Sequence, residues 1–393
     1  MNFIMLSPHF PPNYSKFCTA LRKKSVNVLG IGDEPYDSLS PELKKDLTEY
    51  YKVDDLEEYD KVYRACGYFA HKYGRIDRIE SNNEHWLEAD ARLRTDFNVT
   101  GLKSQELVVM KHKSRMKEVF EKAGINVAPG ILVKKPEDAA AFIAEHGFPV
   151  VVKPDCGVGA AGTFKLNSQE DLDNFLTMER DVEYFMESYV KGEIITYDGL
   201  TDRDGKIVFH SSMVFSGGIM EAVNNNLDLT YYIPRKLPEK IVKAGESSVK
   251  AFGLKERFFH VEFFLTEEKE VYALEINIRP PGGWTVDMFN YANEMDIFHQ
   301  YANVITENRF TAEITRPYNC FYLGRKDSYV YTATPEEVAQ RFGDRIVYHS
   351  PIESIFSAAI GNYGIVARTR SLEEGFEILK YAMEKQRNEE VAG

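Results

Sequence analysis

Two runs of alternating apolar and polar residues, 257–265 and 271–283, form the clearest pattern in the chain. Each run is rich in Phe, Val, Ile and Tyr, has about the length of a β-strand, and is separated from the other by the charged segment 266–270. We predict a β-hairpin whose side chains alternate between two faces. One face of the first strand would carry Phe258, His260, Glu262 and Phe264, and one face of the second would carry Ala273, Glu275, Asn277 and Arg279.

A hairpin that closes with the four-residue loop 267–270 places Glu262 directly opposite Glu275. Like charges at opposed positions destabilise a sheet, because their Cβ atoms lie only about 4.5–5.5 Å apart. A cation between the carboxylates would remove this penalty, and Mg²⁺ prefers carboxylate oxygens, amide oxygens and substrate phosphates. Asn277 would add an amide oxygen, and Arg279 could hold an anion. The alternative is a solvated acidic face, which is common on antiparallel sheets.

The register of this hairpin decides whether the site exists. A loop one residue shorter or longer would turn Glu262 toward the apolar face, because side chains alternate with period two. The expected metal site therefore depends on the length of the loop.

The first 110 residues alternate between strand-like and helix-like segments. Residues 2–7 and 26–30 read as buried strands, with a helix at 15–24 between them. This order predicts a parallel α/β sheet. The segment after the first strand is proline-rich and has no glycine before Gly30. The missing G-x-G-x-x-G argues against an NAD-dependent oxidoreductase.

Glu84 is the candidate ligand-binding residue of this N-terminal region. It follows a strand predicted at 75–80 and precedes a helix predicted at 86–94. Ligands favour the carboxyl ends of parallel strands, so Glu84 could face a cleft. A role as a helix cap explains this residue equally well.

A lysine followed by a loop of small residues is the second chemical signal. Residues 148–154 read as a strand with Lys153 near its end, and the loop 155–162 follows. This loop contains three glycines, Gly157, Gly159 and Gly162. Small residues let backbone N–H groups approach phosphates, and the lysine would place an ammonium beside them. A plain flexible turn would have the same composition.

Composition narrows the classes of function. The chain has 393 residues, 44% of them hydrophobic, which predicts two or three domains with large cores. A formal net charge of −13 argues against nucleic-acid partners and anionic membranes, which require basic surfaces. Four scattered cysteines without CxxC, no signal peptide and no apolar run of membrane length favour a cytoplasmic protein.

Three motifs, in this order, resemble those of the ATP-grasp superfamily. They are Lys113 before Ala123-Gly-Ile-Asn-Val-Ala-Pro129, the strand with Lys153 and its glycine loop, and Glu262 with Glu275-Ile-Asn-Ile-Arg279. The resemblance implies α/β and α+β architecture, with ATP between two α+β subdomains. The expected parts are a Rossmann-like pre-ATP-grasp domain at 1–110, a small ATP-grasp subdomain at 111–182, a large subdomain with the metal site at 183–310 and a small C-terminal lobe at 311–393.

The resemblance also implies roles for individual residues. Lys113 and Lys153 would contact the ATP phosphates, and the loop Gly157–Gly162 would cover them. Adenine contacts would fall on Glu187, Tyr189 and Val190, and the ribose contact on Glu193. The ligands of Mg²⁺ or Mn²⁺ would be Glu262, Glu275 and Asn277. Arg279 would stabilise the reacting acyl-phosphate centre.

The residues after Arg279 refine the expected activity. Pro280-Pro-Gly-Gly-Trp284 is more similar to the continuation in amino-acid and peptide ligases than to that in biotin carboxylases, and no biotin-acceptor motif is present. We expect an ATP-dependent carboxylate–amine ligase that forms an amide through an acyl phosphate and releases ADP and phosphate. A non-catalytic ATP-binding regulatory protein and a carboxylase-type enzyme remain the alternatives.

Small-molecule acids and amines, among them amino acids, would be the partners, and the chain could form a homodimer. Gly282, Gly283 and Arg235 are further candidates for substrate binding. Arg235 ends the segment 216–235, which we expect to be a loop near the active site.

Overall fold

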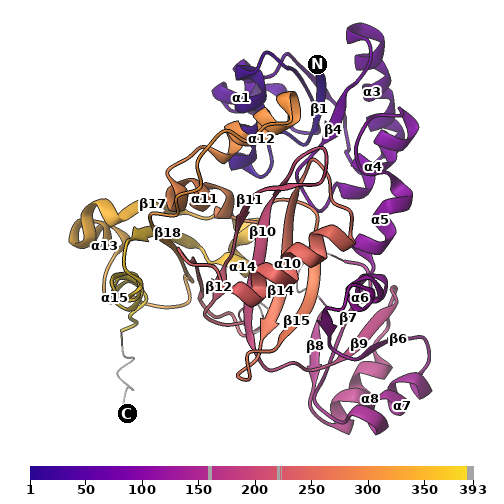
Figure 1. Ribbon diagram of the computed structural model, residues 1–393, viewed down its shortest axis with the longest axis vertical. Coiled ribbons are helices and arrows are strands. Elements are labelled where there is room, and N and C mark those ends of the chain that lie inside the picture. Colours follow the sequence, from indigo (N-terminus) through magenta and orange to yellow (C-terminus); the bar gives the residue numbers. More distant parts are fainter. Residues whose placement is uncertain (158–161, 219–221, 223, 387–393) are drawn as a thin grey trace.

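The computed structural model of the chain describes residues 1–157, 162–218, 222 and 224–386 (Figure 1). Three β-sheets of four, ten and four strands organise these residues. The N-terminal sheet lies at the top of Figure 1, the large sheet crosses the centre, and the small sheet lies at the lower right. No helix within these ranges is long and apolar enough to cross a membrane.

The N-terminal sheet is parallel, as the alternation of strands and helices predicts. Its strand order is β3 (Glu49–Lys52), β2 (Asn27–Gly32), β1 (Asn2–Leu6) and β4 (Arg78–Glu80). The connections hold α1 (Ser15–Lys23), α2 (Pro41–Asp46), α3 (Tyr59–Tyr73), the short helices η1 (Pro12–Tyr14) and η2 (Tyr36–Ser38), and, after β4, α4 (Leu87–Asp96). Strand β1 is buried almost throughout, as is usual for parallel sheets covered by helices on both faces.

The small sheet is antiparallel and carries its own core. Its order is β6 (Gly130–Val133), β9 (Tyr184–Ser188), β7 (Val150–Pro154) and β8 (Phe164–Leu166), with α7 (Pro136–His146) and α8 (Gln169–Thr177) as its helices. Strand β9 pairs with β6 and β7, so the predicted boundary after residue 182 is wrong. Tyr184 and Met186 bury their side chains in this core, and the chain leaves the sheet after Ser188.

The large sheet extends further than predicted, because it includes strands of the C-terminal lobe. Its order is β17 (Ile346–Pro351), β18 (Tyr363–Thr369), β16 (Asn319–Arg325), β13 (Leu229–Ile233), β12 (Val214–Phe215), β10 (Glu193–Thr201), β14 (Phe258–Leu265), β15 (Val271–Asn277) and β5 (Asn126–Val127), with β11 (Ile207–Ser211) beside β10. Strand β13 joins the two parts by pairing with β16. The segment 216–235 is therefore not a loop throughout, since β13 crosses the middle of the sheet.

Helices cover the large sheet and connect it to its neighbours. They are α5 (Ser104–Lys111), α6 (Lys113–Lys122), α10 (Glu239–Ala251), α11 (Thr285–Asn293), α12 (Ile297–Glu307), α13 (Pro335–Phe342), η3 (Gly343–Arg345), α14 (Ser354–Ile360) and α15 (Leu372–Ala382). Helix α10 lies across β10, β14 and β15 (Figure 1) and shares a core with Phe259, Val261 and Phe263. This core fixes one face of β14 and leaves the other face for the site described below.

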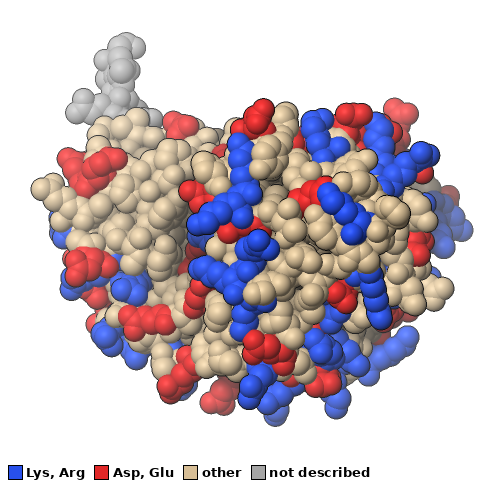
Figure 2. Space-filling model, turned by 90° about the horizontal axis from the view of Figure 1, so that it is seen from above, with Lys and Arg blue, Asp and Glu red and all other residues tan. Residues whose placement is uncertain are grey.

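Charge is mixed on the face of the molecule seen from above. Lys and Arg side chains are interspersed there with Asp and Glu (Figure 2), in a chain of net charge −13. This face does not present the continuous basic surface that nucleic-acid binding requires.

Candidate active site

The hairpin β14–β15 pairs Glu262 with Glu275, as predicted, but by a different route. Its loop is 266–270 rather than 267–270, because Leu265 pairs with Val271. The register then shifts between Phe263, which pairs with Ala273, and Glu262. This β-bulge takes up the extra loop residue and restores the opposed carboxylates. The expectation that a longer loop would destroy the site is therefore wrong.

The bulge also changes which residues share a face. Tyr272 pairs with Phe264, and both line the cavity described below. Ala273 pairs with Phe263 and packs in the core, although it too contributes to the cavity lining. The predicted faces of the second strand are therefore reversed between the loop and the bulge. They hold beyond it, where Glu275 opposes Glu262.

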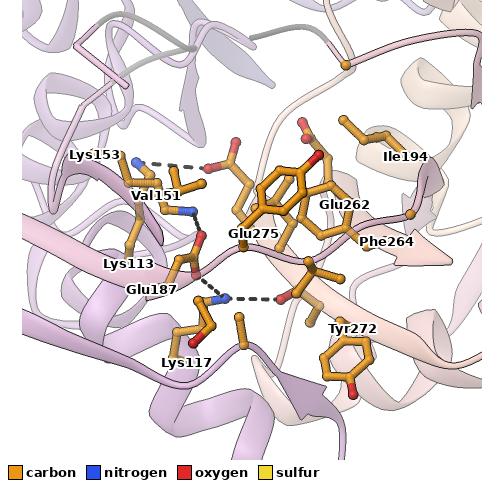
Figure 3. A pocket seen from close by; sticks show the side chains of 18 of the residues that line it. Lys113, Lys117, Val151, Lys153, Glu187, Ile194, Glu262, Phe264, Tyr272 and Glu275 are labelled. Carbon is orange, nitrogen blue, oxygen red and sulfur yellow. Dashed lines mark hydrogen bonds and ion pairs between the residues drawn. The ribbon is translucent and has the colours of Figure 1, made fainter. Parts of the chain in front are cut away.

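A cavity of about 270 Å³ lies between the small sheet and the large sheet (Figure 3). Seven of the residues predicted for the site line it: Lys113, Lys153, Glu187, Tyr189, Val190, Glu262 and Glu275. Gly157, Gly162, Glu193 and Asn277 lie outside this lining, and Glu193 is exposed at the start of β10. Gly159 lies outside the described residues. Two predicted phosphate-binding lysines, Lys113 and Lys153, thus meet two predicted metal ligands, Glu262 and Glu275, at one cavity.

Asp155 is one reason why Lys113 and Lys153 come together. It follows β7, and its carbonyl accepts from the Lys113 N–H at 2.8 Å while its Oδ1 accepts from the Ser114 N–H at 2.7 Å. These bonds satisfy free N–H groups at the start of α6, and the dipole of the helix favours the negative charge of Asp155 at that end. Asp155 thereby fastens the first turn of α6 to the end of β7. Sequence reasoning did not find this role.

Buried ion pairs join the lysines and glutamates of the cavity (Figure 3). Glu187 Oε1 lies 2.5 Å from Lys153 Nζ, and Glu187 Oε2 lies 2.7 Å from Lys117 Nζ. Lys117 also donates to the Ala273 carbonyl at 3.2 Å. Burial alone would raise the pKa of Glu187, but the two ammonium groups outweigh it and lower that pKa to about 2. Both oxygens of Glu187 are therefore engaged by lysines.

Lys117 is a site residue that the sequence analysis missed. It lies four residues after Lys113 on α6 and is buried, so both side chains project from the same side of the helix. This spacing was the signal that could have identified it. The Nζ of Lys113 lies 3.9 Å from Glu275 Oε2. Helix α6 therefore contributes one ammonium group to Glu187, from Lys117, and one to Glu275, from Lys113.

The proposed metal ligands present oxygen atoms of the right chemistry. Glu262 and Glu275 are opposed, and Asn277 donates to Glu275 Oε1 at 3.2 Å. Mg²⁺ usually binds one or two carboxylates together with substrate phosphates. This donor set fits an ion that arrives with a nucleotide. It does not resemble a closed protein cage, and no cluster of three or more His, Cys, Asp or Glu that could hold a metal occurs among the described residues.

His260, two residues before Glu262 on β14, is hydrogen-bonded to the Glu262 carboxylate. The sequence analysis assigns it no role. Its Nε2 lies 2.9 Å from Glu262 Oε1, and its Nδ1 lies 2.6 Å from Asp198 Oδ1. Burial would lower the pKa of His260, but the two carboxylates raise it to about 10. The imidazole is therefore a cation between two buried anions.

Arg279 pairs with Glu84 across the boundary between the N-terminal domain and the hairpin. Its Nε and Nη2 lie 3.0 and 2.5 Å from Glu84 Oε2. Helix α4 has Trp86 as its N-cap residue, without a side-chain cap, so Glu84 serves Arg279 rather than the helix. Glu84 follows β4 and does not line the cavity, so its role in substrate binding stays a prediction.

The proline-rich turn after β1 holds the glycine loop that follows Arg279. Asn13 Nδ2 donates to the Gly283 carbonyl at 3.1 Å, and the Tyr14 hydroxyl donates to the Pro281 carbonyl at 3.3 Å. Gly283 has a φ of +62°, which favours glycine. Gly282 and Gly283 follow Arg279 by three and four residues, and their role in substrate binding stays a prediction.

Arg235 has a structural position. Its Nε donates to the Arg316 carbonyl at 3.1 Å and its Nη1 to the Arg370 carbonyl at 2.9 Å. These bonds tie the end of β13 to the C-terminal lobe. Arg235 is not part of the cavity lining, and its assignment to substrate binding stays a prediction.

The chain is similar in sequence to known proteins. Residues 146–287 match a family described as ATP-grasp domain. The chain is 24% identical over 264 residues to an L-arginine-specific L-amino acid ligase from Bacillus subtilis, a match that covers 65% of this chain and 63% of the relative. It is 29% identical over 174 residues to a D-alanine–D-alanine ligase from Clostridium botulinum, covering 43% of this chain and 57% of the relative.

The fold has a close counterpart among solved structures. An L-amino acid ligase from Bacillus licheniformis superimposes with a TM-score of 0.74 at 16% identity, covering 96% of both chains. This similarity shows the fold. The chain spans less than two thirds of the length of the curated relatives named above, 63% and 57% respectively.

Proposed function

Because this chain carries an ATP-grasp domain, we propose that it is an ATP-dependent carboxylate–amine ligase. One observation carries the proposal. Lys113 and Lys153 converge on the same cavity as the opposed carboxylates of Glu262 and Glu275. Phosphoryl transfer from ATP requires positioning and charge neutralisation more than a protein nucleophile, and this cavity offers both.

The nucleotide would lie between the small and large sheets. We assign the phosphates to the ammonium groups of Lys113 and Lys153 and to the loop that contains Gly157 and Gly162. The Tyr189 N–H already donates to the Pro149 carbonyl at 3.1 Å. We therefore assign the adenine edge to the Tyr189 carbonyl and the Val190 N–H.

Glu262, Glu275 and Asn277 would hold Mg²⁺, which, when bound, neutralises charge on the phosphates during transfer. The residues of the chain prepare this site in advance. Asn277 holds one oxygen of Glu275, and His260 holds one oxygen of Glu262. For the ion, Glu262 would use its Oε2, and Glu275 would use its Oε2, which lies 3.9 Å from the Lys113 ammonium.

We propose an α-amino acid as one substrate, on the basis of the ion pair between Arg279 and Glu84. Arg279 lies two residues beyond Asn277, the last residue of β15, and its partner Glu84 comes from the N-terminal domain. The pair combines one cation with one anion in a partly enclosed position. An α-amino acid is a zwitterion with the same two charges, so its carboxylate can bind the Arg279 guanidinium and its ammonium can bind the Glu84 carboxylate. Arg279 would then hold the carboxylate oxygens while the acyl phosphate forms.

The alternatives predict different requirements. A carboxylase-type enzyme would release ADP with bicarbonate alone, and a regulatory protein would bind ATP without releasing ADP. The two lysines and two carboxylates of the cavity favour turnover, because a binding module has no need for an opposed pair of acids.

An ADP-release screen over pairs of amino acids, with mass spectrometry of the products, tests the proposal. We expect ADP release that requires both an acid and an amine, and a product lighter than the sum of its substrates by one water. Release with bicarbonate and no amine would support the carboxylase alternative instead.

A further inference from the structure

A chain of buried polar side chains leads from the interior of the large sheet to Glu262. Thr196 and Asp198 lie on β10, His260 and Glu262 lie on β14, and the register pairs Thr196 with Glu262 and Asp198 with His260. The His260 ring is bounded by Asp198 Oδ1 at 2.6 Å and Glu262 Oε1 at 2.9 Å. The Thr196 hydroxyl donates to the other oxygen of Asp198. The four side chains therefore form one continuous network.

Burying this network of polar side chains is costly. Asp198 is fully buried and His260 is 6% exposed, on two strands whose neighbouring residues supply an apolar core. Taking charges out of water is expensive, and apolar residues of similar volume often stabilise a protein as well as a buried ion pair does. A role beyond stability is therefore indicated.

The pairing of β14 with β15 indicates a role for His260 at the Glu262 carboxylate. His260 and Asn277 are paired across β14 and β15, and so are Glu262 and Glu275. His260 holds Oε1 of the glutamate two residues away on its strand, and Asn277 holds Oε1 of the glutamate two residues away on the other strand. Two support residues thus fix two carboxylates, and each leaves one oxygen unengaged by its support.

We propose that His260, itself held by Asp198, is a positioning residue that fixes the Glu262 carboxylate for the metal bound with ATP. The inference rests on the proposed function, because it assigns Glu262 to that metal. Hydrogen-bonded partners of metal ligands orient them, and loss of such a partner typically weakens metal binding 10–100-fold.

His260→Leu removes the support and keeps an apolar side chain, His260→Gln keeps one N–H donor, and Asp198→Asn loosens the imidazole. His210→Leu is the matched control. His210 lies on the neighbouring strand β11, its Nδ1 lies 2.8 Å from the hydroxyl of Tyr197 on β10, and it does not line the cavity.

The assay is Mn²⁺ binding with saturating ADP, read from the electron paramagnetic resonance signal of free Mn²⁺. Calorimetry of ADP binding in EDTA is run beside it, because a general structural defect would weaken both. We expect His260→Leu to lose tenfold or more in Mn²⁺ affinity, with ADP affinity in EDTA within twofold of wild type. His260→Gln should recover part of the loss, Asp198→Asn should fall between, and His210→Leu should match wild type.

Unchanged Mn²⁺ affinity in folded His260→Leu would overturn the inference. If His260→Leu does not fold, unchanged affinity in both Asp198→Asn and His260→Gln would overturn it equally. A wild-type protein that binds no Mn²⁺ with ADP would overturn the proposed function as well, so the two failures are distinguishable.

Discussion

Replacement of Glu187 by Gln tests the buried charge cluster of the cavity most sharply. Glu187 is 4% exposed and lies between the ammonium groups of Lys117 and Lys153. The substitution keeps the shape of the side chain and removes its charge. It leaves two buried ammonium groups without their shared partner, which is the costly way to break a buried pair.

The size of the effect follows from the pKa of Glu187. The two neighbouring ammonium groups lower the pKa of this carboxyl from its ordinary value of 4.5 to about 2 in the folded protein. A difference of this size corresponds to about 3 kcal/mol of folding free energy. Because the folded pKa is depressed, this stabilisation is present above pH 4.5 and is lost as the pH falls through about 2. At pH 7 the mutant should therefore be less stable by about 3 kcal/mol or slightly more.

Urea unfolding followed by circular dichroism, at pH 7 and at steps down to pH 3, measures the difference. Glu121→Gln is the matched control, since Glu121 is an exposed residue of α6, and its free energy of unfolding should change by less than about 0.5 kcal/mol. The gap between wild type and Glu187→Gln should narrow as the pH falls. A gap below 0.5 kcal/mol at pH 7, or one that is independent of pH, would refute the reasoning.

Three further substitutions probe the proposed chemistry. Lys153→Ala should weaken ATP binding by about 1.5–3 kcal/mol through loss of a charge-assisted phosphate contact, and calorimetric affinity within twofold of wild type would contradict this. Glu275→Gln should stay folded and lose turnover, with a melting temperature close to that of wild type, because its ion pair with Lys113 is long at 3.9 Å. Arg279→Lys should bind ATP normally and lose rate in an ADP-release assay, because an ammonium cannot reproduce the guanidinium fork on Glu84 or on a substrate carboxylate; an unchanged rate would place Arg279 outside the chemistry.

Local patterns were sufficient to predict much of the site. Period-two alternation placed Glu262, Glu275 and Asn277 on one hairpin, and a strand ending near Lys153 was readable from its valines. These features depend on residues close together in the chain. The ATP-grasp resemblance, which needs the motifs in order, then indicated the fold.

The features that were missed depend on tertiary structure. The longer loop and the bulge have opposite effects on register, so alternation alone could not reveal either. The contact between His260 and Asp198 joins residues 62 positions apart and requires the pairing of β10 with β14. The sequence analysis predicts a loop over 216–235, although strand β13 (Leu229–Ile233) within it is rich in residues that favour strands. Its neighbour β16 lies far along the chain and supplies the pairing that a sequence window cannot show.

The central claim is that a substrate carboxylate takes the γ-phosphoryl group of ATP before the amine attacks. An amino acid substrate labelled with ¹⁸O in its carboxylate tests this directly, through mass spectrometry of the phosphate released during amide formation. The account predicts phosphate that carries one ¹⁸O from the acid for each amide formed. Phosphate without the label, in a reaction that still yields the amide and ADP, would contradict it.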